Sequence, residues 1–160
     1  MAVEPMMEAM RVLEDRGLAD TCRLSDRGEL TVHFETLAGT FPLRMFYVEE
    51  DDMLTVVAFV SQRVPTERMD DVDSLLCGLN WGAPGSAYLA VDHDDGEVSA
   101  RAALPVASLT ACRPAVAALV DAVIEMLVVA VPLLPRAPTG LDSGPQRFWS
   151  QGTGTRRDVN

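Results

Sequence analysis

The fold is decided by residues 53–104, which have the sequence MLTVVAFVSQRVPTERMDDVDSLLCGLNWGAPGSAYLAVDHDDGEVSARAAL. The nearly continuous apolar run over residues 53–61 is typical of a strand that is covered on both faces, which places it centrally in a sheet. An amphipathic helix follows Pro65, and a turn at Asp94-Asp95-Gly96 then joins two further strands. This order predicts an α+β fold in which helices pack on an antiparallel sheet.

The residues before this stretch predict one helix and two strands. Residues 4–18 have helical periodicity, and Gly17 ends the helix. We expect its buried face to carry the apolar residues Met6, Met7, Met10 and Leu13. Residues 29–35 alternate between apolar and polar side chains, as in a strand with one buried face. Residues 41–49 form a second strand, and Pro42 near its start favours an edge or a bulge at that point.

The second helix begins at Pro65-Thr66, because proline suits the first turn of a helix. It is expected to end over the polar and glycine residues Gly78, Asn80 and Gly82. Strands are predicted over residues 86–92 and 97–104. We expect the last helix to begin at an N-cap formed by Thr110, to continue to about Val131, and to stop at the prolines that follow. The element order is thus α-β-β-β-α-β-β-α.

The last helix is apolar over more of its circumference than one sheet face can cover. A membrane-spanning role is disfavoured because Asp121 and Glu125 lie at its middle, where each would cost about 3 kcal/mol in hydrocarbon. A second subunit, a client protein or the chain's own tail should therefore cover the outer side. We expect a homodimer in which Val120 and Ile124 contribute to the interface.

Composition indicates one domain over residues 1–134 and a flexible tail over residues 135–160. The 160-residue chain is 48% hydrophobic, which suffices for one core. The tail is rich in proline, glycine, serine, threonine and arginine. Its exception is Phe148-Trp149 beside Arg147, a group of residues suited to anchoring the tail to a protein surface.

The net charge of −11 restricts the classes of partner. An acidic protein is repelled by nucleic acid and by anionic membranes, and it attracts a partner with a basic surface. The N-terminus lacks the basic and apolar regions of a signal peptide, and the three cysteines are dispersed, so we expect a cytoplasmic protein with reduced thiols. All thirteen basic residues are arginine. This composition excludes chemistry that needs lysine, such as a P-loop or a pyridoxal-phosphate Schiff base.

No pattern of catalytic or metal-binding residues is apparent. The segment Asp92-His93-Asp94-Asp95-Gly96-Glu97 is acidic, but it lacks the ligand spacing of an EF-hand, and a solvated hairpin in which Gly96 has positive φ explains it better. His33 and His93 have no nucleophile near them in sequence. A dyad of a histidine with one of the three cysteines stays open, although dispersed cysteines are more often structural. We therefore expect no cofactor and no metal.

Trp81 near the end of the second helix has two interpretations. It could cover the edge of the core, or it could be an exposed aromatic anchor of the kind that dominates protein interfaces.

The element order resembles that of the YbjN family, small bacterial proteins whose fold is similar to type III secretion chaperones. The residues that carry the resemblance are Phe59-Val60, Arg63-Val64-Pro65, Arg68, Leu75-Leu76, Leu79-Asn80, Asp95-Gly96-Glu97-Val98 and Arg101. The long final helix completes the pattern, and the resemblance covers residues 1–134 without the tail. The departures are Gly78 within the second helix and the Gly/Pro-rich loop after Trp81. The resemblance implies a homodimer that binds protein clients in a regulatory role, and it supplies no catalytic residues.

The sequence thus favours a cytoplasmic, non-enzymatic, chaperone-like adaptor that forms a homodimer and binds a partner protein. The partner could be a basic nucleic-acid-binding protein or a stress- or DNA-damage-response protein. The candidate protein-binding residues are Trp81, Val120, Ile124, Phe148 and Trp149. The alternatives are a regulator that senses a small ligand between the sheet and the final helix, and an enzyme that uses a cysteine.

Overall fold

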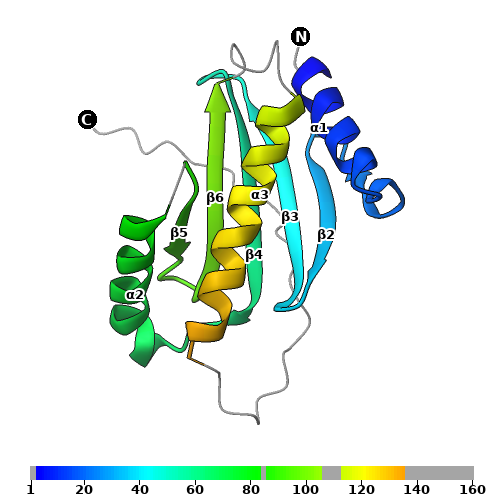
Figure 1. Cartoon of the computed structure of the whole chain (residues 1–160). Coiled ribbons are helices and arrows are strands. Elements are labelled where there is room, and N and C mark those ends of the chain that lie inside the picture. Colours follow the sequence, from blue (N-terminus) through cyan, green and yellow to red (C-terminus); the bar gives the residue numbers. More distant parts are fainter. Residues whose placement is uncertain (1–2, 84–85, 106–112, 136–160) are drawn as a thin grey trace, which may run out of the picture.

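The computed structural model describes residues 3–83, 86–105 and 113–135, which form an antiparallel sheet with helices on one face and along one edge (Figure 1). Within these residues the α-helices are α1 (Val3–Asp15), α2 (Met69–Gly82) and α3 (Arg113–Ala130). The strands are β1 (Arg23–Leu24), β2 (Leu30–Thr36), β3 (Gly39–Val48), β4 (Met53–Arg63), β5 (Tyr88–Val91) and β6 (Glu97–Pro105). Short 3-10 turns are η1 (Ala19–Thr21), η2 (Thr66–Arg68) and η4 (Val131–Leu133).

The strands of the sheet follow the order β1-β2-β3-β4-β6-β5, and every neighbouring pair is antiparallel. The apolar strand β4 lies between β3 and β6, which confirms its predicted central position. Pro42 lies just outside the β3–β4 ladder, whose first pair is Leu43 with Ala58. The proline therefore costs no hydrogen bond to β4, although β3 itself is an internal strand.

The turn between β5 and β6 is built as the sequence predicts. Gly96 has φ of +76°, and a Cβ atom there would lie 2.3 Å from the carbonyl oxygen of Val64. The backbone amide of Val64 in turn donates to the carbonyl of Gly96 at 2.8 Å. Glycine is required at this position both for its conformation and for the close approach of the neighbouring backbone.

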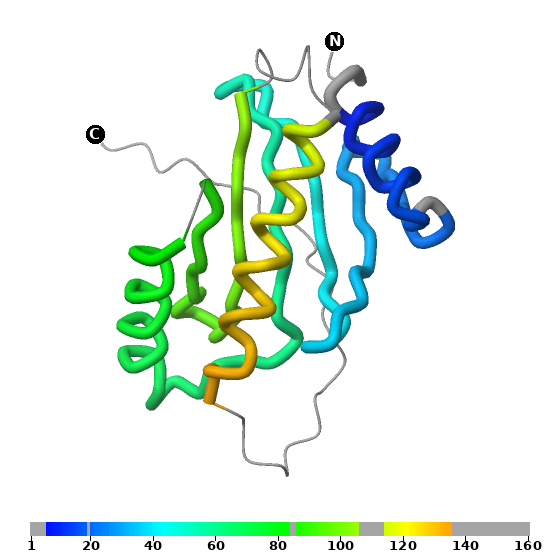
Figure 2. Tube along the Cα trace, in the orientation of Figure 1, coloured from blue at the N-terminus to red at the C-terminus, as the bar shows by residue number. Residues whose placement is uncertain are grey.

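The core lies between the sheet and the inner side of α3, which crosses β4 and β6 (Figure 2). Helix α1 packs beside α3, and Arg16 of the loop after α1 binds both carboxylate oxygens of Asp121 at 2.7 and 2.8 Å. The arginine also donates to the carbonyl of Ala117 at 3.2 Å. The second side of α3 is thus partly covered by α1, and not only by a second subunit, a client protein or the tail as predicted.

The buried face of α1 agrees with the prediction at three of the four residues named. Met6 and Leu13 are buried and Met10 packs partly buried against the core, but Met7 is 42% exposed, and Ala9 and Val12 complete the buried face. The prediction for Met7 was wrong because residues 6, 9 and 13 share one helical face and residue 7 lies about 100° from residue 6.

The remaining differences between the predicted and the observed structure concern the ends of helices and one short strand. Helix α2 continues through Gly78 and ends at Gly82, so Gly78 does not help to close it. Strand β1 was not predicted, because two residues are too few for a periodic pattern. The described part of the last helix begins at Arg113, and the proposed N-cap Thr110 lies outside the described residues.

Candidate protein-binding surface

Helix α2 packs along β5, the edge strand of the sheet. Its buried residues Met69, Val72 and Leu76 recur three to four positions apart and face the sheet. The side chain of Asn80, near the end of this helix, donates from Nδ2 to the carbonyl of Leu89 at 2.9 Å. The backbone amide of Leu89 donates back to Asn80 Oδ1 at 2.7 Å. One amide side chain therefore satisfies both backbone groups of a β5 residue.

These two bonds protect the sheet edge. Leu89 lies opposite Ala100 of β6, and its N–H and C=O both point toward α2 because both are bound by Asn80. An edge strand with free backbone groups can pair with another chain, and proteins block such edges in several ways. Here the carboxamide of Asn80 occupies the position that the backbone of a neighbouring strand would take.

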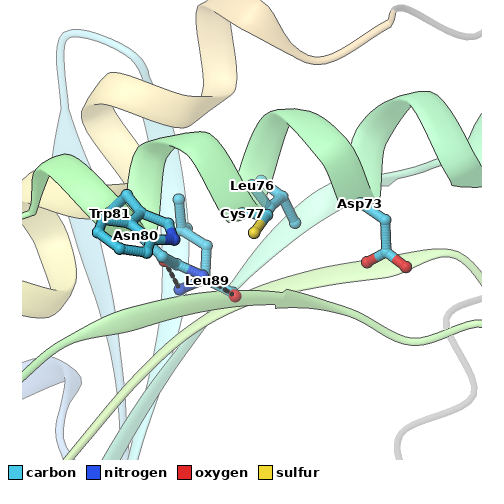
Figure 3. Close-up of a pocket in the computed structure, with 6 residues that line it drawn as sticks. All are labelled: Asp73, Leu76, Cys77, Asn80, Trp81 and Leu89. Atoms are coloured by element: carbon cyan, nitrogen blue, oxygen red, sulfur yellow. Dashed lines mark hydrogen bonds between the residues drawn. The ribbon is translucent and has the colours of Figure 1, made fainter.

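A groove with a volume of about 550 Å³ runs between α2 and β5. It is lined by Asp73, Leu76, Cys77, Asn80, Trp81 and Leu89 (Figure 3). Trp81 is 89% exposed at one end of the groove, and Tyr88 of β5 is 49% exposed. Trp81 does not cover the core, and the structure thus supports the second interpretation, an exposed aromatic side chain on the surface. A groove that combines polar side chains with leucines and an exposed tryptophan is suited to binding a protein.

Acidic side chains continue this surface along α2. Asp70, Asp73, Cys77 and Trp81 are spaced three or four residues apart, so they share one side of the helix, and all four are exposed. The carboxylate Oδ2 of Asp73 lies 2.8 Å from Nε2 of His93 in the β5–β6 turn. The groove thus has an apolar floor, an aromatic end and an acidic end.

The other predicted binding residues do not belong to this surface. Val120 is fully buried and Ile124 is 9% exposed, both in the core beneath α3. This placement corrects the expectation that they face a second subunit: the wide apolar arc of α3 is explained largely by packing within the chain. Phe148 and Trp149 lie outside the described residues.

A second apolar surface lies at the outer end of α3 and was not predicted residue by residue. Val129 is 54% exposed, Leu133 is 52% exposed, and Met126 is partly buried. Met126 and Val129 lie in the last turns of α3, and Leu133 lies in the 3-10 turn η4 that follows, so all three belong to the same end of the helix. The wide apolar arc of α3 indicated that some of its apolar residues would be exposed. Which residues are exposed depends on the packing of α1 and the sheet against the helix.

The acidic turn between β5 and β6 uses its carboxylates to bind its own backbone. Asp92 Oδ1 accepts from the amide of Asp94, and Asp95 Oδ1 accepts from the amide of Glu97, each at 2.9 Å. Such bonds are typical of aspartates that shape a turn, which confirms the predicted hairpin. Across the described ranges, no group of three or more histidine, cysteine or acidic side chains is placed to hold a metal ion.

Charges beside this turn are unevenly solvated. Arg63 pairs with Asp95 and lies 3.2 Å from Glu97. Burial acts to raise the pKa of Asp95, but the hydrogen bond and charge of Arg63, together with the amide of Glu97, outweigh it and lower the pKa. For Glu97 burial dominates over the attraction of Arg63, and its pKa is raised.

The cysteines in the described residues occupy different environments. Cys77 is exposed in the groove, whereas Cys22 is partly buried. Burial, and then the charge of Glu14, raise the pKa of the Cys22 thiol, which disfavours the thiolate that a nucleophile needs. Cys112 lies outside the described residues.

Among the residues that the structure describes, one helical segment, Pro114–Leu133, is long and apolar enough to cross a membrane, with a mean hydropathy of 2.3. A core helix of a soluble protein can have the same composition. In this structure the inner side of the segment packs on β4, β5 and β6, and Asp121 pairs with Arg16.

The fold is similar to that of a chain in a solved protein complex. A chain of the crystal structure of the ExsC–ExsE complex superposes with a TM-score of 0.60 at 14% sequence identity, over 86% of this chain and 98% of that chain. A chain of the heterodimeric ExoU–SpcU complex from the type III secretion system of Pseudomonas aeruginosa gives a TM-score of 0.47 at 25% identity, over 78% of this chain and 96% of that chain. No protein-family model and no curated protein matches the sequence.

The chain thus shares its fold with a chain of the ExsC–ExsE complex. The predicted α+β architecture is confirmed, and the predicted element order holds apart from the additional short strand β1.

Proposed function

We propose that this protein is a non-enzymatic, chaperone-like adaptor that forms a homodimer and binds a partner protein in the cytoplasm. The observation that carries the proposal is the groove between α2 and β5, with Trp81 exposed at one end and acidic side chains at the other. The likeness in fold to a chain of the ExsC–ExsE complex supports it, because that structure is an assembly of two different proteins. The residues shared with the YbjN pattern support membership of that family.

The partner is expected to carry a basic surface beside an apolar segment. A tryptophan on a desolvated patch supplies much of the affinity in protein interfaces. Acidic residues such as Asp70 and Asp73 would orient a basic partner and raise its association rate, and bare nucleic acid would be repelled by the net charge of −11. A basic nucleic-acid-binding protein or a stress-response protein fits this description.

The exposed apolar patch at the end of α3 supports the homodimer. Val129 in the last turn of α3 and Leu133 in η4 are each more than half exposed, and the same patch on a second subunit would be self-complementary about a two-fold axis. Light scattering at micromolar concentration should show a dimer, and Val129→Asp should shift it to a monomer with an unchanged circular dichroism spectrum. A wild-type monomer would contradict this part of the proposal.

The partner-binding part is tested with two matched surface variants. Trp81→Ala removes the aromatic side chain from the groove, and Leu24→Ala removes a 54% exposed side chain from the opposite edge of the sheet. Affinity capture from the native cell should yield a protein that is retained by the wild type and by Leu24→Ala and lost with Trp81→Ala. A partner retained equally by both variants would exclude the groove as its binding surface.

The association rate with that partner should fall as salt rises, because the Debye length shortens from about 10 Å at 0.1 M to about 3 Å at 1 M. Association that is insensitive to salt would show that the acidic side chains serve solubility alone.

A further inference from the structure

The charge of the chain is divided unequally between the domain and its C-terminal segment. Residues 136–160 carry four arginines and two aspartates, a formal charge of +2, which leaves −13 for residues 1–135. A segment of opposite sign, covalently attached, is held close to the acidic surface whether or not it binds there. The chain thus contains a basic segment of the kind that the groove is expected to bind.

The two aromatic residues of this segment lie next to a positive charge. Arg147, Phe148 and Trp149 are consecutive, and they offer a guanidinium next to two aromatic rings. The groove offers the complementary order on α2, with Asp70 and Asp73 toward its first turns and Cys77 and Trp81 further along. An arginine paired with a carboxylate and aromatic rings packed against an apolar floor are the two contacts that dominate protein interfaces.

The connection is long enough for this contact to form within one chain. The described chain ends at Pro135, whose carbonyl accepts a hydrogen bond from Gln62 at the end of β4, shortly before η2 and α2. Arg147 lies twelve positions after Pro135, and an extended chain over twelve positions spans about 40 Å. The 14 residues of α2 span about 21 Å, so every position along the groove lies within reach.

We infer that the segment Arg147-Phe148-Trp149 binds the groove between α2 and β5 of its own chain and competes there with the partner protein. The inference rests on the proposed function for the competition, but binding of the segment itself is independent of any partner. It assigns an autoinhibitory role to the C-terminal segment: a partner enters the groove at a cost equal to the free energy of displacing the segment.

The reactivity of Cys77 measures whether the groove is occupied, because Cys77 is an exposed thiol that lines the groove. The experiment measures alkylation of Cys77 by iodoacetamide in the purified full-length protein, with the modified cysteine identified by peptide mass spectrometry. Phe148→Ala/Trp149→Ala removes the aromatic rings without changing charge. The matched control is Leu141→Ala/Val159→Ala, which removes two apolar side chains elsewhere in the same segment.

The rings should protect Cys77 in the wild type and in the control. For a segment with an effective concentration on the order of 1 mM and a Kd of about 0.2 mM, the groove is free about one sixth of the time, so Cys77 would be alkylated about sixfold more slowly. The double variant Phe148→Ala/Trp149→Ala should therefore react about sixfold faster than the control. Equal rates for these two proteins would overturn the inference without bearing on the proposed function.

Two further arms identify the occupant. Protection of Cys77 by a segment of the same chain is independent of protein concentration. Protection that rises with concentration would assign the groove to a second copy and overturn the inference.

Phe148→Cys should form an intramolecular disulfide with Cys77 under mild oxidation, and Val159→Cys should do so much less. If the segment competes with the partner, Phe148→Ala/Trp149→Ala should bind the partner about sixfold more tightly than the control. An unchanged affinity together with lost protection of Cys77 would overturn the competition.

Discussion

Replacement of Asn80 by alanine tests whether the carboxamide holds α2 against the edge strand. The substitution removes the 2.9 Å bond to the carbonyl of Leu89 and the 2.7 Å bond from its amide. Each bond contributes about 1 kcal/mol, and alanine regains about 0.5 kcal/mol because it is the better helix former. The expected net loss is about 1.5 kcal/mol, which corresponds to a fall in Tm of about 3–6 °C for a chain of this size.

Equilibrium unfolding in urea, followed by far-UV circular dichroism, measures this loss. Ser74→Ala is the matched control, because Ser74 is exposed on the same helix and the change brings a similar gain in helix propensity. The control should be unchanged or slightly more stable than the wild type. A free energy of unfolding for Asn80→Ala within about 0.3 kcal/mol of the control would refute the reasoning, since the two bonds would then contribute nothing net.

The same variant has a second expected property. With Asn80 absent, the amide and carbonyl of Leu89 become available on the outer edge of β5. An unblocked edge favours strand pairing between molecules, so Asn80→Ala should aggregate faster than the control below its Tm. Thioflavin fluorescence and light scattering would both detect this change.

Three other predictions concern the core, the hairpin and pH. Because the side chain of Val120 is fully buried, Val120→Ala should lower the free energy of unfolding in urea by about 2–3 kcal/mol, and Val120→Asp should prevent folding. A stably folded Val120→Asp would contradict the buried position of this residue. Gly96→Ala should lower the free energy of unfolding more than Gly28→Ala. Both glycines have positive φ, but of the two only Gly96 lies where a Cβ would meet backbone atoms. Equal losses of stability in the two variants would show that the close contact with Val64 has no effect. Burial raises the pKa of Glu97 above its ordinary value of 4.5, so the folded state holds the proton more tightly and stability falls as pH rises from the unfolded pKa to the folded pKa. Glu97→Gln should therefore gain stability relative to the wild type between pH 4 and pH 7 in thermal melts, and a gain that does not grow with pH would count against this origin.

Elements with a clear pattern of apolar residues were predictable from the sequence. The run from Met53 predicted a central strand, and the alternation over residues 29–35 predicted a strand whose Leu30 and Val32 are fully buried. Gly96 was predictable because positive φ in a short hairpin has few solutions other than glycine. In each of these cases the physical cause lies within a few residues of the chain.

The parts that could not be predicted depend on contacts between distant residues. Asn80 was assigned to the end of α2, and nothing near it in sequence indicates that its amide reaches Leu89. The apolar arc of α3 was correctly noted, but its division between core and surface depends on α1, which is held beside it by Arg16 and Asp121. Exposure of Trp81 was one of two open alternatives, and the packing of α2 decides between them.

The position of α2 and β5 in the chain has a consequence for how related proteins can diverge. Strands β4 and β6 pair directly at the middle of the sheet, although α2 and β5 lie between them in sequence. The helix and the edge strand are therefore an insertion between Arg63 and Glu97, two residues that pair with each other in the β4–β6 ladder. Mutations on its outer side can accumulate without altering the pairing of the central strands. A gene that encodes this scaffold could thus acquire a new binding specificity within about thirty codons, while the rest of the coding sequence stays under selection for folding alone.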